Sequence, residues 1–318
     1  MDEMDEKIGM GWLPDYPDFR DCTADTTEVS EKMKALGETE SINAMLTKVG
    51  VVEDEKKTKN SKNVKKARKP NLPDTVDLTQ WFSPVENQGS LGSCTANAGV
   101  GIVEYFEKRA FGKHIDASRL FLYKATRNMS KWTGDSGAFL RTTMGAMVLF
   151  GVPPEEYWPY VIADFDKEPS PFCYAYAQNY KAINYYRLDP PGTTKPDLLN
   201  SIKTNLAAGL PSMFGFTVYS SYIQAAGTGK IPYPTTGEKI IGGHAVVAAG
   251  YDDNLKITNT TSGAVQTTGA LLIRNSWGTG WGSNGYGWLP YAYVMNGLAV
   301  DWWSLVKSNW INSGEFRI

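Results

Sequence analysis

The chain has 318 residues, of which 42% are hydrophobic and 21% charged, so it can form a large core without disulfides or metals. A formal net charge of −2 argues against a general nucleic-acid binder, and no apolar run approaches the roughly 18 residues of a membrane span. The three cysteines and two histidines are too few and too dispersed for a disulfide framework or a tetrahedral metal site.

The N-terminal residues differ from the rest of the chain. They begin MDEMDEK, without the basic start of a secretory signal, so we expect a cytoplasmic protein or one exported by a route that the sequence does not show. Residues 11–19 carry aromatic residues spaced by prolines. Because proline disfavours helix on both sides of itself, this stretch is expected to be extended along a surface. Short helices are expected within residues 29–48.

A basic segment follows. After the acids at 53–55 it carries seven lysines and one arginine, with no acid, up to Pro70. This composition is typical of a disordered linker. The alternatives are a processing site and a patch for nucleic acid or an anionic membrane, although the segment lacks aromatic residues that stack on bases.

From residue 71 onward the composition is that of a globular domain. Apolar spacing and end signals predict helices over 116–129, 139–150 and 197–208. Further along, strands are predicted over 213–219, 245–251 and 270–274, between turns rich in Gly, Thr and Asn. Helices thus cluster before about residue 210 and strands after it, which favours an α+β fold with two unlike lobes.

Cys94 stands in the most informative stretch. It follows a glycine-rich turn and begins a segment of helical apolar spacing that stops before Gly112. The positive end of a helix dipole lowers the pKa of a thiol at the helix N-terminus and favours the nucleophilic thiolate. The alternative is a buried cysteine that caps an ordinary core helix.

Two further stretches carry candidate catalytic groups. His244 begins an apolar strand, so a base there can face a cleft while the strand is anchored in the core. Asn275 follows a predicted strand; its side-chain oxygen can accept a ring N–H of histidine, and Trp277 over that bond would exclude water. The alternatives are a core histidine and a tryptophan-rich packing turn. His114, in a polar turn, is expected at the surface.

The order Gln88, Cys94, His244, Asn275 resembles the papain family of cysteine peptidases, over about residues 74–303. The leader resembles that of a prokaryotic, xylellain-like branch. The resemblance implies a papain-like fold of two lobes, helical and β-sheet, with the active-site cleft between them. It implies that Cys94 attacks the scissile carbonyl, that His244 shares its proton in a thiolate–imidazolium pair, and that Asn275 orients His244. Gln88 and the backbone N–H of Cys94 would form the oxyanion hole, and no cofactor is involved.

The resemblance also implies substrate-binding residues. Gly137 would pair with extended substrate backbone, Ala245 would line the second unprimed pocket, and Trp277 would shape the primed side. Asp301 would lie near the floor of the second unprimed pocket, where an acid favours a basic side chain; a surface position is the alternative. The partner is then a polypeptide substrate, and we expect a monomer without nucleic-acid or membrane partners.

Two departures from the family bear on the packing behind the nucleophile. Leu91 stands at the first cysteine of the family's Cys-Gly-Ser-Cys-Trp pattern, so that disulfide is absent, and Cys173 has no family partner. Thr95 stands where the pattern has Trp. The four polar catalytic positions are all present.

The N-terminal segment suggests latency. We hypothesise that residues 11–22 lie along the cleft and block it as an intramolecular inhibitor, and that cleavage within 56–69 releases activity. The alternative is that the segment packs on a lobe surface. The expected divisions are a pro-segment-like region 1–70 with linker 51–70, and a peptidase domain 71–318 with helical lobe about 71–195, β lobe about 196–300 and C-terminal tail 301–318.

Other functions stay open at this point. The same Cys–His pair serves acyl-transferring or deamidating relatives. A catalytically weak or inactive papain-like module would bind polypeptide without cutting it, although both Cys94 and His244 are present. An RNA-associated protein using the linker fits the acidic charge balance poorly.

Overall fold

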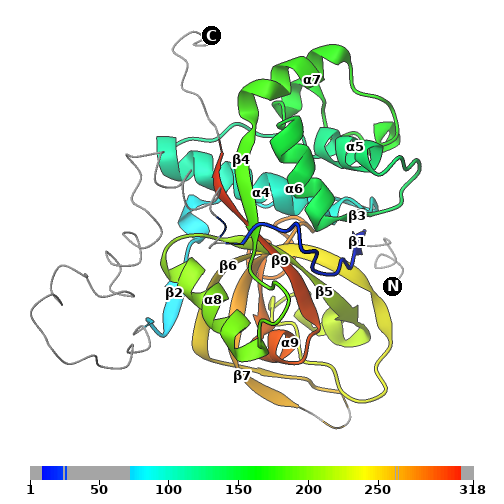
Figure 1. Ribbon diagram of the computed structural model, residues 1–318. Coiled ribbons are helices and arrows are strands. Elements are labelled where there is room, and N and C mark those ends of the chain that lie inside the picture. Colours follow the sequence, from blue (N-terminus) through cyan, green and yellow to red (C-terminus); the bar gives the residue numbers. More distant parts are fainter. Residues whose placement is uncertain (1–8, 24–25, 27–71, 262, 264, 309–318) are drawn as a thin grey trace, which may run out of the picture.

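The computed structural model describes residues 9–23, 26, 72–261, 263 and 265–308. The helices predicted within 29–48 and the basic segment 51–70 fall outside these residues. Helices form one part of the molecule and a large antiparallel sheet the other, with the N-terminal segment between them (Figure 1). The predicted α+β architecture of two unlike lobes is confirmed.

The helical part is built around α4, Cys94–Phe111, whose first three turns are buried on every side. α5 and α6 pack against it. Ser118 begins α5 by accepting a hydrogen bond from Phe121 N, and α4 ends at Gly112, whose φ of 72° suits a glycine. The predicted helices 116–129 and 139–150 are confirmed within three residues. The remaining bounds are α5 Arg119–Met129, α6 Leu140–Leu149, α7 Pro171–Ala177, and 3-10 turns at Thr79–Trp81, Glu155–Tyr157, Ile162–Asp164 and Gln178–Tyr180.

Seven strands form the sheet, in the order β4–β9–β5–β6–β7–β8, with β2 added to β6. The predicted strands are present, but β6 and β7 are longer because the polar stretch between them continues their hairpin, with Lys256 opposite Thr268. β6 also begins at Ile240, so His244 lies within this strand, where it pairs with Phe216 of β5, and does not begin it as predicted. α8 and α9 pack against the sheet. The bounds are β2 Thr75–Asp77, β4 Ala182–Arg187, α8 Lys195–Ala207, β5 Ser212–Tyr219, β6 Ile240–Thr258, β7 Gln266–Arg274, β8 Tyr286–Pro290, α9 Tyr291–Met295, β9 Ala299–Ser308 and a 3-10 turn at Ser220–Ala225.

Strand β9 corrects the expected C-terminal tail from residue 301. It lies between β4 and β5 in the sheet, and its Trp302 and Trp303 are fully buried. The ring of Trp302 stacks on Phe214 of β5 with centroids 3.8 Å apart. Burying such large rings contributes several kcal/mol, of order 2–3 for each, so this segment is anchored in the core.

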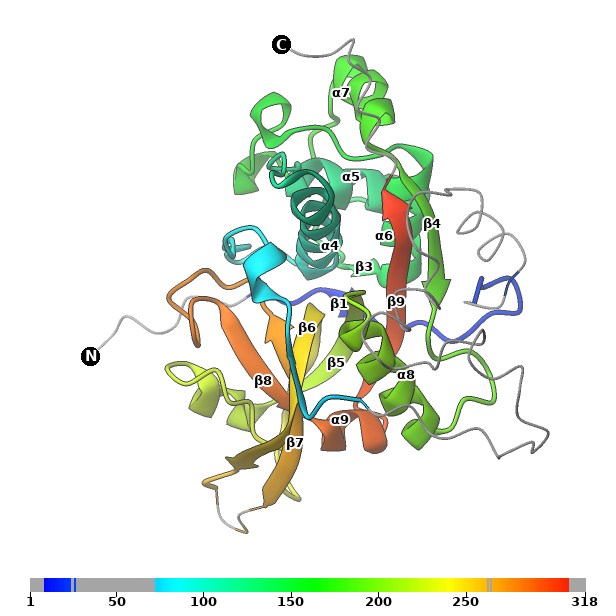
Figure 2. The same cartoon turned by 90° about the vertical axis from the view of Figure 1, so that its left-hand side faces the viewer.

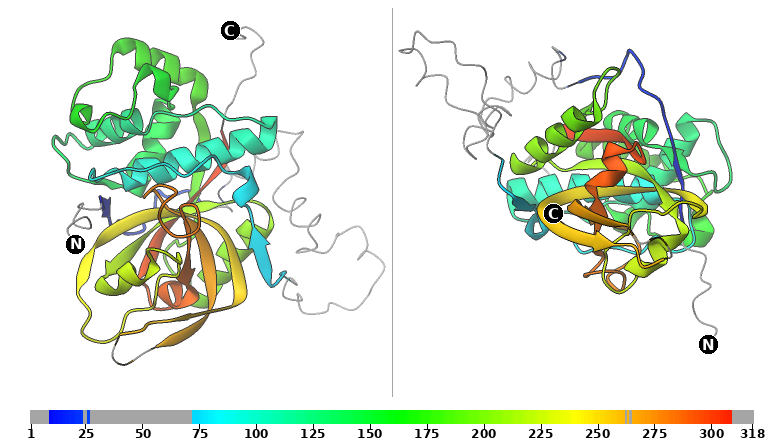
Figure 3. Two further views of the ribbon diagram at one scale, coloured as in Figure 1. Left: turned by 180° about the vertical axis from the view of Figure 1, so that it is seen from behind. Right: turned by 90° about the horizontal axis from the view of Figure 1, so that it is seen from below.

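The N-terminal segment crosses the junction of the two parts. β1, Trp12–Leu13, pairs in parallel with β3, Ala138–Phe139, at the helical side, and also contacts β6 of the sheet. Figure 2 shows β1 between α4 and the sheet, and Figure 3 shows the segment stretched over this junction. Within the described residues, no helix has the length and apolar character that crossing a membrane requires.

Candidate active site

Cys94 is the first residue of α4 and is fully buried. The helix brings it against the sheet, where the backbone of Ala245 in β6 hydrogen-bonds to the thiol. Ala245 follows His244 in the same strand. The nucleophile candidate from the helical part and the base candidate from the sheet part therefore meet at one place.

His244 is held on two sides. Its Nε2 lies 2.8 Å from Oδ1 of Asn275, which follows β7. The indole of Trp277 stacks on the imidazole with ring centroids 4.6 Å apart and planes 21° apart. Nδ1 of His244 is buried and has no hydrogen-bond partner among the described residues. The Asn275 bond thus orients the ring and leaves Nδ1 as the nitrogen available for proton exchange.

Gln88 is buried beside the start of α4. Its Nε2 donates to the carbonyl oxygens of Leu91, at 2.8 Å, and Gly9, at 3.0 Å. Ser276 donates from Oγ to Gln88 Oε1 at 2.5 Å, which fixes the amide with its N–H groups toward the N-terminal segment. Ser276 was not singled out from the sequence, although its place directly after Asn275 is a signal that could have found it.

The backbone of residues 9–13 covers this site. Gly9 N donates to Gly89 O at 3.0 Å, and Ala138 N donates to Gly11 O at 2.8 Å. Gly137, expected to face substrate, instead faces Gly11: a Cβ on Gly137 would stand 2.3 Å from Gly11 O. Within the described residues, the covering backbone includes Gly9, which precedes the hypothesised 11–22, and Gly9 and Gly11 allow its close approach.

The side chain of Trp12 fills a narrow slot in the sheet and is 6% exposed. A Cβ on Gly215 of β5 would stand 1.9 Å from the indole, and one on Gly243 of β6 would stand 2.8 Å from it. Two glycines on neighbouring strands thus create the space for a flat ring. Neither this slot nor Trp12 as its occupant was predicted.

Asp301 forms the polar end of the slot. It accepts a hydrogen bond from Trp12 Nε1 at 3.1 Å and one from Trp303 Nε1 at 2.7 Å, and Arg187 Nη1 lies 3.3 Å away. Its φ of 64° is unusual for a residue with a side chain, and Asp189 accepts the Asp301 N–H at 2.8 Å. Asp301 is fully buried, which excludes the alternative of a surface aspartate.

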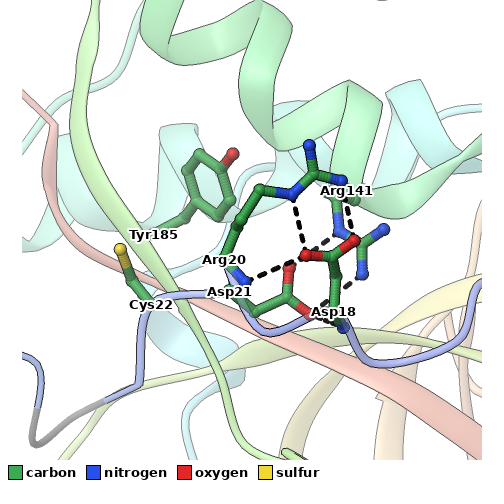
Figure 4. A pocket seen from close by; sticks show the side chains of 6 residues that line it. All are labelled: Asp18, Arg20, Asp21, Cys22, Arg141 and Tyr185. Carbon is green, nitrogen blue, oxygen red and sulfur yellow. Dashed lines mark hydrogen bonds and ion pairs between the residues drawn. The ribbon is translucent and has the colours of Figure 1, made fainter.

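Charged residues hold the segment beyond Trp12. Arg141 of α6 contacts Asp15 at 2.6 Å and Asp21 at 2.8 Å, and Arg187 lies 3.6 Å from Asp21. Figure 4 shows Asp21 and Arg141 at a cavity of about 330 Å³, lined by Asp18, Arg20, Asp21, Cys22, Arg141 and Tyr185. The N-terminal segment is thus attached to the domain by ion pairs as well as by the indole.

Burial changes the ionisation of the catalytic candidates. It raises the pKa of the Cys94 thiol to about 11, although backbone hydrogen bonds from Ala245 and Gly11 oppose the rise. It also lowers the pKa of His244 to about 4, against the raising effect of Asn275. The sequence led us to expect a thiolate at the start of the helix. With the cleft covered, loss of water outweighs that effect and both groups are neutral.

The other candidates lie as follows. Ala245 is buried at the thiol, and Cys173 is a buried free thiol whose Sγ lies 3.5 Å from Tyr157 O, away from the site. His114 is partly exposed and pairs with Asp116 at 3.2 Å. No group of three metal-ligating side chains gathers anywhere in the described part of the chain.

Comparisons with known proteins agree with this geometry. The family model described as papain family cysteine protease matches residues 72–299. An uncharacterized peptidase C1-like protein of Acanthamoeba polyphaga mimivirus is 36% identical over 72% of this chain and 71% of its own, and cathepsin K of Gallus gallus is 30% identical over 65% and 54%.

Among solved structures, xylellain, a cysteine protease from Xylella fastidiosa, aligns with a TM-score of 0.69 and 31% identity. The alignment covers 94% of this chain and 96% of xylellain, so it extends beyond the stretch that the family model matches. The chain is a cysteine-type peptidase that belongs to the papain family, in its xylellain-like branch.

Proposed function

We propose that the chain is a cysteine endopeptidase whose catalytic residues are Cys94, His244, Asn275 and Gln88, and that its N-terminal segment holds it in a latent state. The orientation of His244 is the observation that supports the catalytic residues of this proposal. Asn275 and Trp277 fix the ring with Nε2 engaged and Nδ1 unpartnered, next in sequence to the residue that contacts the Cys94 thiol. A purely structural histidine would have both ring nitrogens satisfied.

The reaction follows from these positions. The Cys94 proton passes to His244 Nδ1, and the thiolate forms a bond to the scissile carbonyl carbon. The carbonyl electron pair moves to oxygen, where Gln88 Nε2–H and the Cys94 backbone N–H stabilise it. His244 then protonates the leaving amine as the C–N bond breaks. Water attacks the resulting thioester with His244 as base, releasing the acid and restoring the thiol.

Latency is supported by what the segment does to each reacting group. The Gly9 carbonyl occupies the Gln88 amide, and the thiol meets backbone hydrogen bonds from Gly11 and Trp12. The segment thus engages both the Gln88 amide and the thiol, the groups that a substrate would have to reach. Both catalytic groups are neutral while it stays in place.

Substrate binding would use the surfaces that the segment covers. Once Gly11 leaves, Gly137 and Ala138 offer their backbone to extended substrate, and Trp277 borders the His244 side. Ala245 and Asp301 would then line the slot that Trp12 fills. An acid at its end favours side chains that donate a hydrogen bond or carry positive charge.

The test is the mass of the intact protein after exposure to an epoxysuccinyl thiol-protease inhibitor, together with hydrolysis of a denatured protein substrate. The full chain, a chain lacking residues 1–70 and each of these with Cys94→Ala are compared. We expect one adduct at Cys94, formed much faster in the shortened chain, with hydrolysis in parallel.

The outcomes separate the two halves of the proposal. Equal labelling in both lengths would keep the peptidase and reject latency. Labelling without hydrolysis would favour an acyl-transferring relative. No labelling in either length would mean that the Cys94–His244 pair is not reactive, as in a module that binds polypeptide without cutting it.

A further inference from the structure

The loop before the nucleophile, residues 89–93 (the nucleophile loop), is tied to one carboxylate. Gly92 N donates to Asp135, with distances of 2.9 Å to Oδ1 and 3.1 Å to Oδ2. The approach requires glycine, because a Cβ on Gly92 would stand 2.8 Å from Asp135 Oδ1. Gly92 lies two residues before Cys94, so this bond restrains the backbone that leads into the nucleophile.

The same carboxylate reaches a second loop, residues 134–137 (the pairing loop), to which Asp135 itself belongs. Tyr123 of α5 donates from its hydroxyl to Asp135 Oδ1 at 2.6 Å. That hydroxyl accepts the N–H of Gly137 at 3.1 Å. Gly137 has a φ of 72°, and the next residue, Ala138, pairs with the N-terminal segment. Asp135 and Tyr123 therefore set the conformation of the backbone that faces the cleft.

From this bridge we propose that Asp135 is a positioning residue of the peptidase, which joins the nucleophile loop to the pairing loop and so keeps Cys94 in register with bound substrate. The proposal rests on the catalytic role of Cys94. The chain has Leu91 where the family's pattern has a disulfide cysteine, so the nucleophile loop lacks that covalent anchor. A charge-assisted hydrogen bond to a backbone N–H supplies a non-covalent one.

Arg127 and Asp166 contact the neighbours of Asp135, namely Gly134 in the pairing loop and the ring of Tyr123. Arg127, whose side chain is fully buried, lies with its guanidinium carbon 4.2 Å from the Tyr123 ring centroid and donates to Gly134 O at 2.5 Å. Asp166 accepts the Gly134 N–H at 3.0 Å. The pairing loop is thus rigid enough to transmit a constraint to Gly92. A displacement of about 1 Å at a reacting atom can cost on the order of 100-fold in rate, which gives such a constraint kinetic weight.

The test uses the full chain with Trp12→Ala, in which the cleft is expected to be open, as the parent. Into it are placed Asp135→Ala, Asp135→Asn and, as a matched control, Asp116→Ala, whose exposed carboxylate pairs with His114 in the described part of the chain. We measure kcat and KM, the rate of epoxysuccinyl labelling of Cys94, and hydrogen exchange of the peptide containing Gly92.

Asp135→Ala should lower kcat about 10- to 100-fold, with a smaller change in KM, slow the labelling and speed exchange at Gly92. Asp135→Asn keeps an acceptor oxygen and should recover most of the loss, and Asp116→Ala should match the parent. Equal kcat and exchange in Asp135→Ala and the parent would overturn the proposal, as would equal damage from Ala and Asn. If Asp135→Ala does not fold, Asp135→Asn and Tyr123→Phe carry the exchange measurement.

Failure of the inference can be told from failure of the proposed function. If the parent itself neither labels nor hydrolyses, the catalytic role of Cys94 is wrong. The Gly92 exchange rate, measured in the full chain with its natural Trp12, still reports whether Asp135 restrains the nucleophile loop.

Discussion

The N-terminal segment, residues 9–22, and the peptidase domain, residues 72–308, are held together in different ways. The domain has a continuous apolar core that includes the stacked Phe214 and Trp302. The segment contributes one buried ring, Trp12, and the partly buried side chains of Met10 and Cys22. Backbone hydrogen bonds and ion pairs hold the rest, while Tyr16 and Phe19 are 87% and 93% exposed. Contacts of this kind can be exchanged for water or substrate, as the proposed release of the segment requires.

The largest expected effect comes from removing a catalytic side chain of the peptidase domain. In the chain lacking residues 1–70, Cys94→Ala or His244→Ala should lower kcat by about 10⁴-fold or more, since both act in the same step. The two losses should not add in the double variant. Hydrolysis assays measure the effect, and unchanged circular dichroism shows that folding is intact. A loss below tenfold for either residue would contradict its assigned role.

The next largest effect is expected from weakening the contact between the N-terminal segment and the domain. In the full chain, Trp12→Ala should raise the labelling rate of Cys94 on the order of 100-fold, because removing a buried tryptophan costs about 3 kcal/mol or more. The closed form loses that energy, whereas the open form does not. Intact-mass kinetics measure the change. An unchanged rate would mean that the indole does not hold the cleft closed.

Two variants sharpen this result. Trp12→Phe keeps a ring but loses the N–H to Asp301, and should give a smaller rise, about tenfold. Gly215→Ala places a methyl where the indole lies and should also open the cleft. It should, however, raise KM for peptide substrates, because the slot is partly filled. If Gly215→Ala left the full chain closed, Trp12 would not occupy this slot in solution.

A smaller effect is expected from the ion pairs. Arg141→Ala removes contacts to Asp15 and Asp21 and should raise the labelling rate of the full chain about fivefold, the effect of about 1 kcal/mol. Because the side chains of Arg141 and Asp15 are 26% and 23% exposed, added salt should raise the labelling rate of the unaltered chain and have less effect on Arg141→Ala. If neither salt nor Arg141→Ala changed the labelling rate, the ion pairs would not contribute to holding the segment on the domain.

The sequence predicted the parts of the site that depend on local order. A glycine-rich turn followed by helical spacing placed Cys94 at the start of α4. Apolar strand patterns singled out His244 and Asn275, which lie 2.8 Å apart, although β6 begins four residues before His244. These signals are periodic or confined to a few neighbouring residues. The same kind of signal predicted the α+β architecture.

What the sequence did not predict depends on contacts between distant segments. The slot for Trp12 needs Gly215 and Gly243 at diagonal positions on two paired strands, which no local pattern reveals. A hydrogen bond such as the one from Gly92 N to Asp135 Oδ1 joins backbone to a side chain, and it produces no periodic pattern in the sequence. The direction of the Cys94 pKa was missed for the same reason, because it depends on how completely the folded chain buries the thiol.

That pKa also sets the expected pH dependence. Burial holds the pKa of Cys94 near 11 in the closed form, above its value once water and His244 reach the thiol. The closed form therefore binds this proton more tightly, and this contribution to its advantage over the open form is lost as the pH rises toward 11. His244 acts in acid and in the opposite sense, because burial lowers its pKa to about 4 and its protonation disfavours the closed form. In the full chain, labelling should rise about tenfold per pH unit over that window, since only the thiolate reacts.

The most direct measurement is the pKa of Cys94 in the full chain and in its Trp12→Ala variant, from the pH dependence of thiolate ultraviolet absorbance after subtraction of the matching Cys94→Ala spectra. We predict that the Cys94 thiol titrates near 11 in the full chain and far below that value in the variant, where the thiolate forms beside His244. The same low pKa in both chains would contradict the claim that the N-terminal segment suppresses the nucleophile.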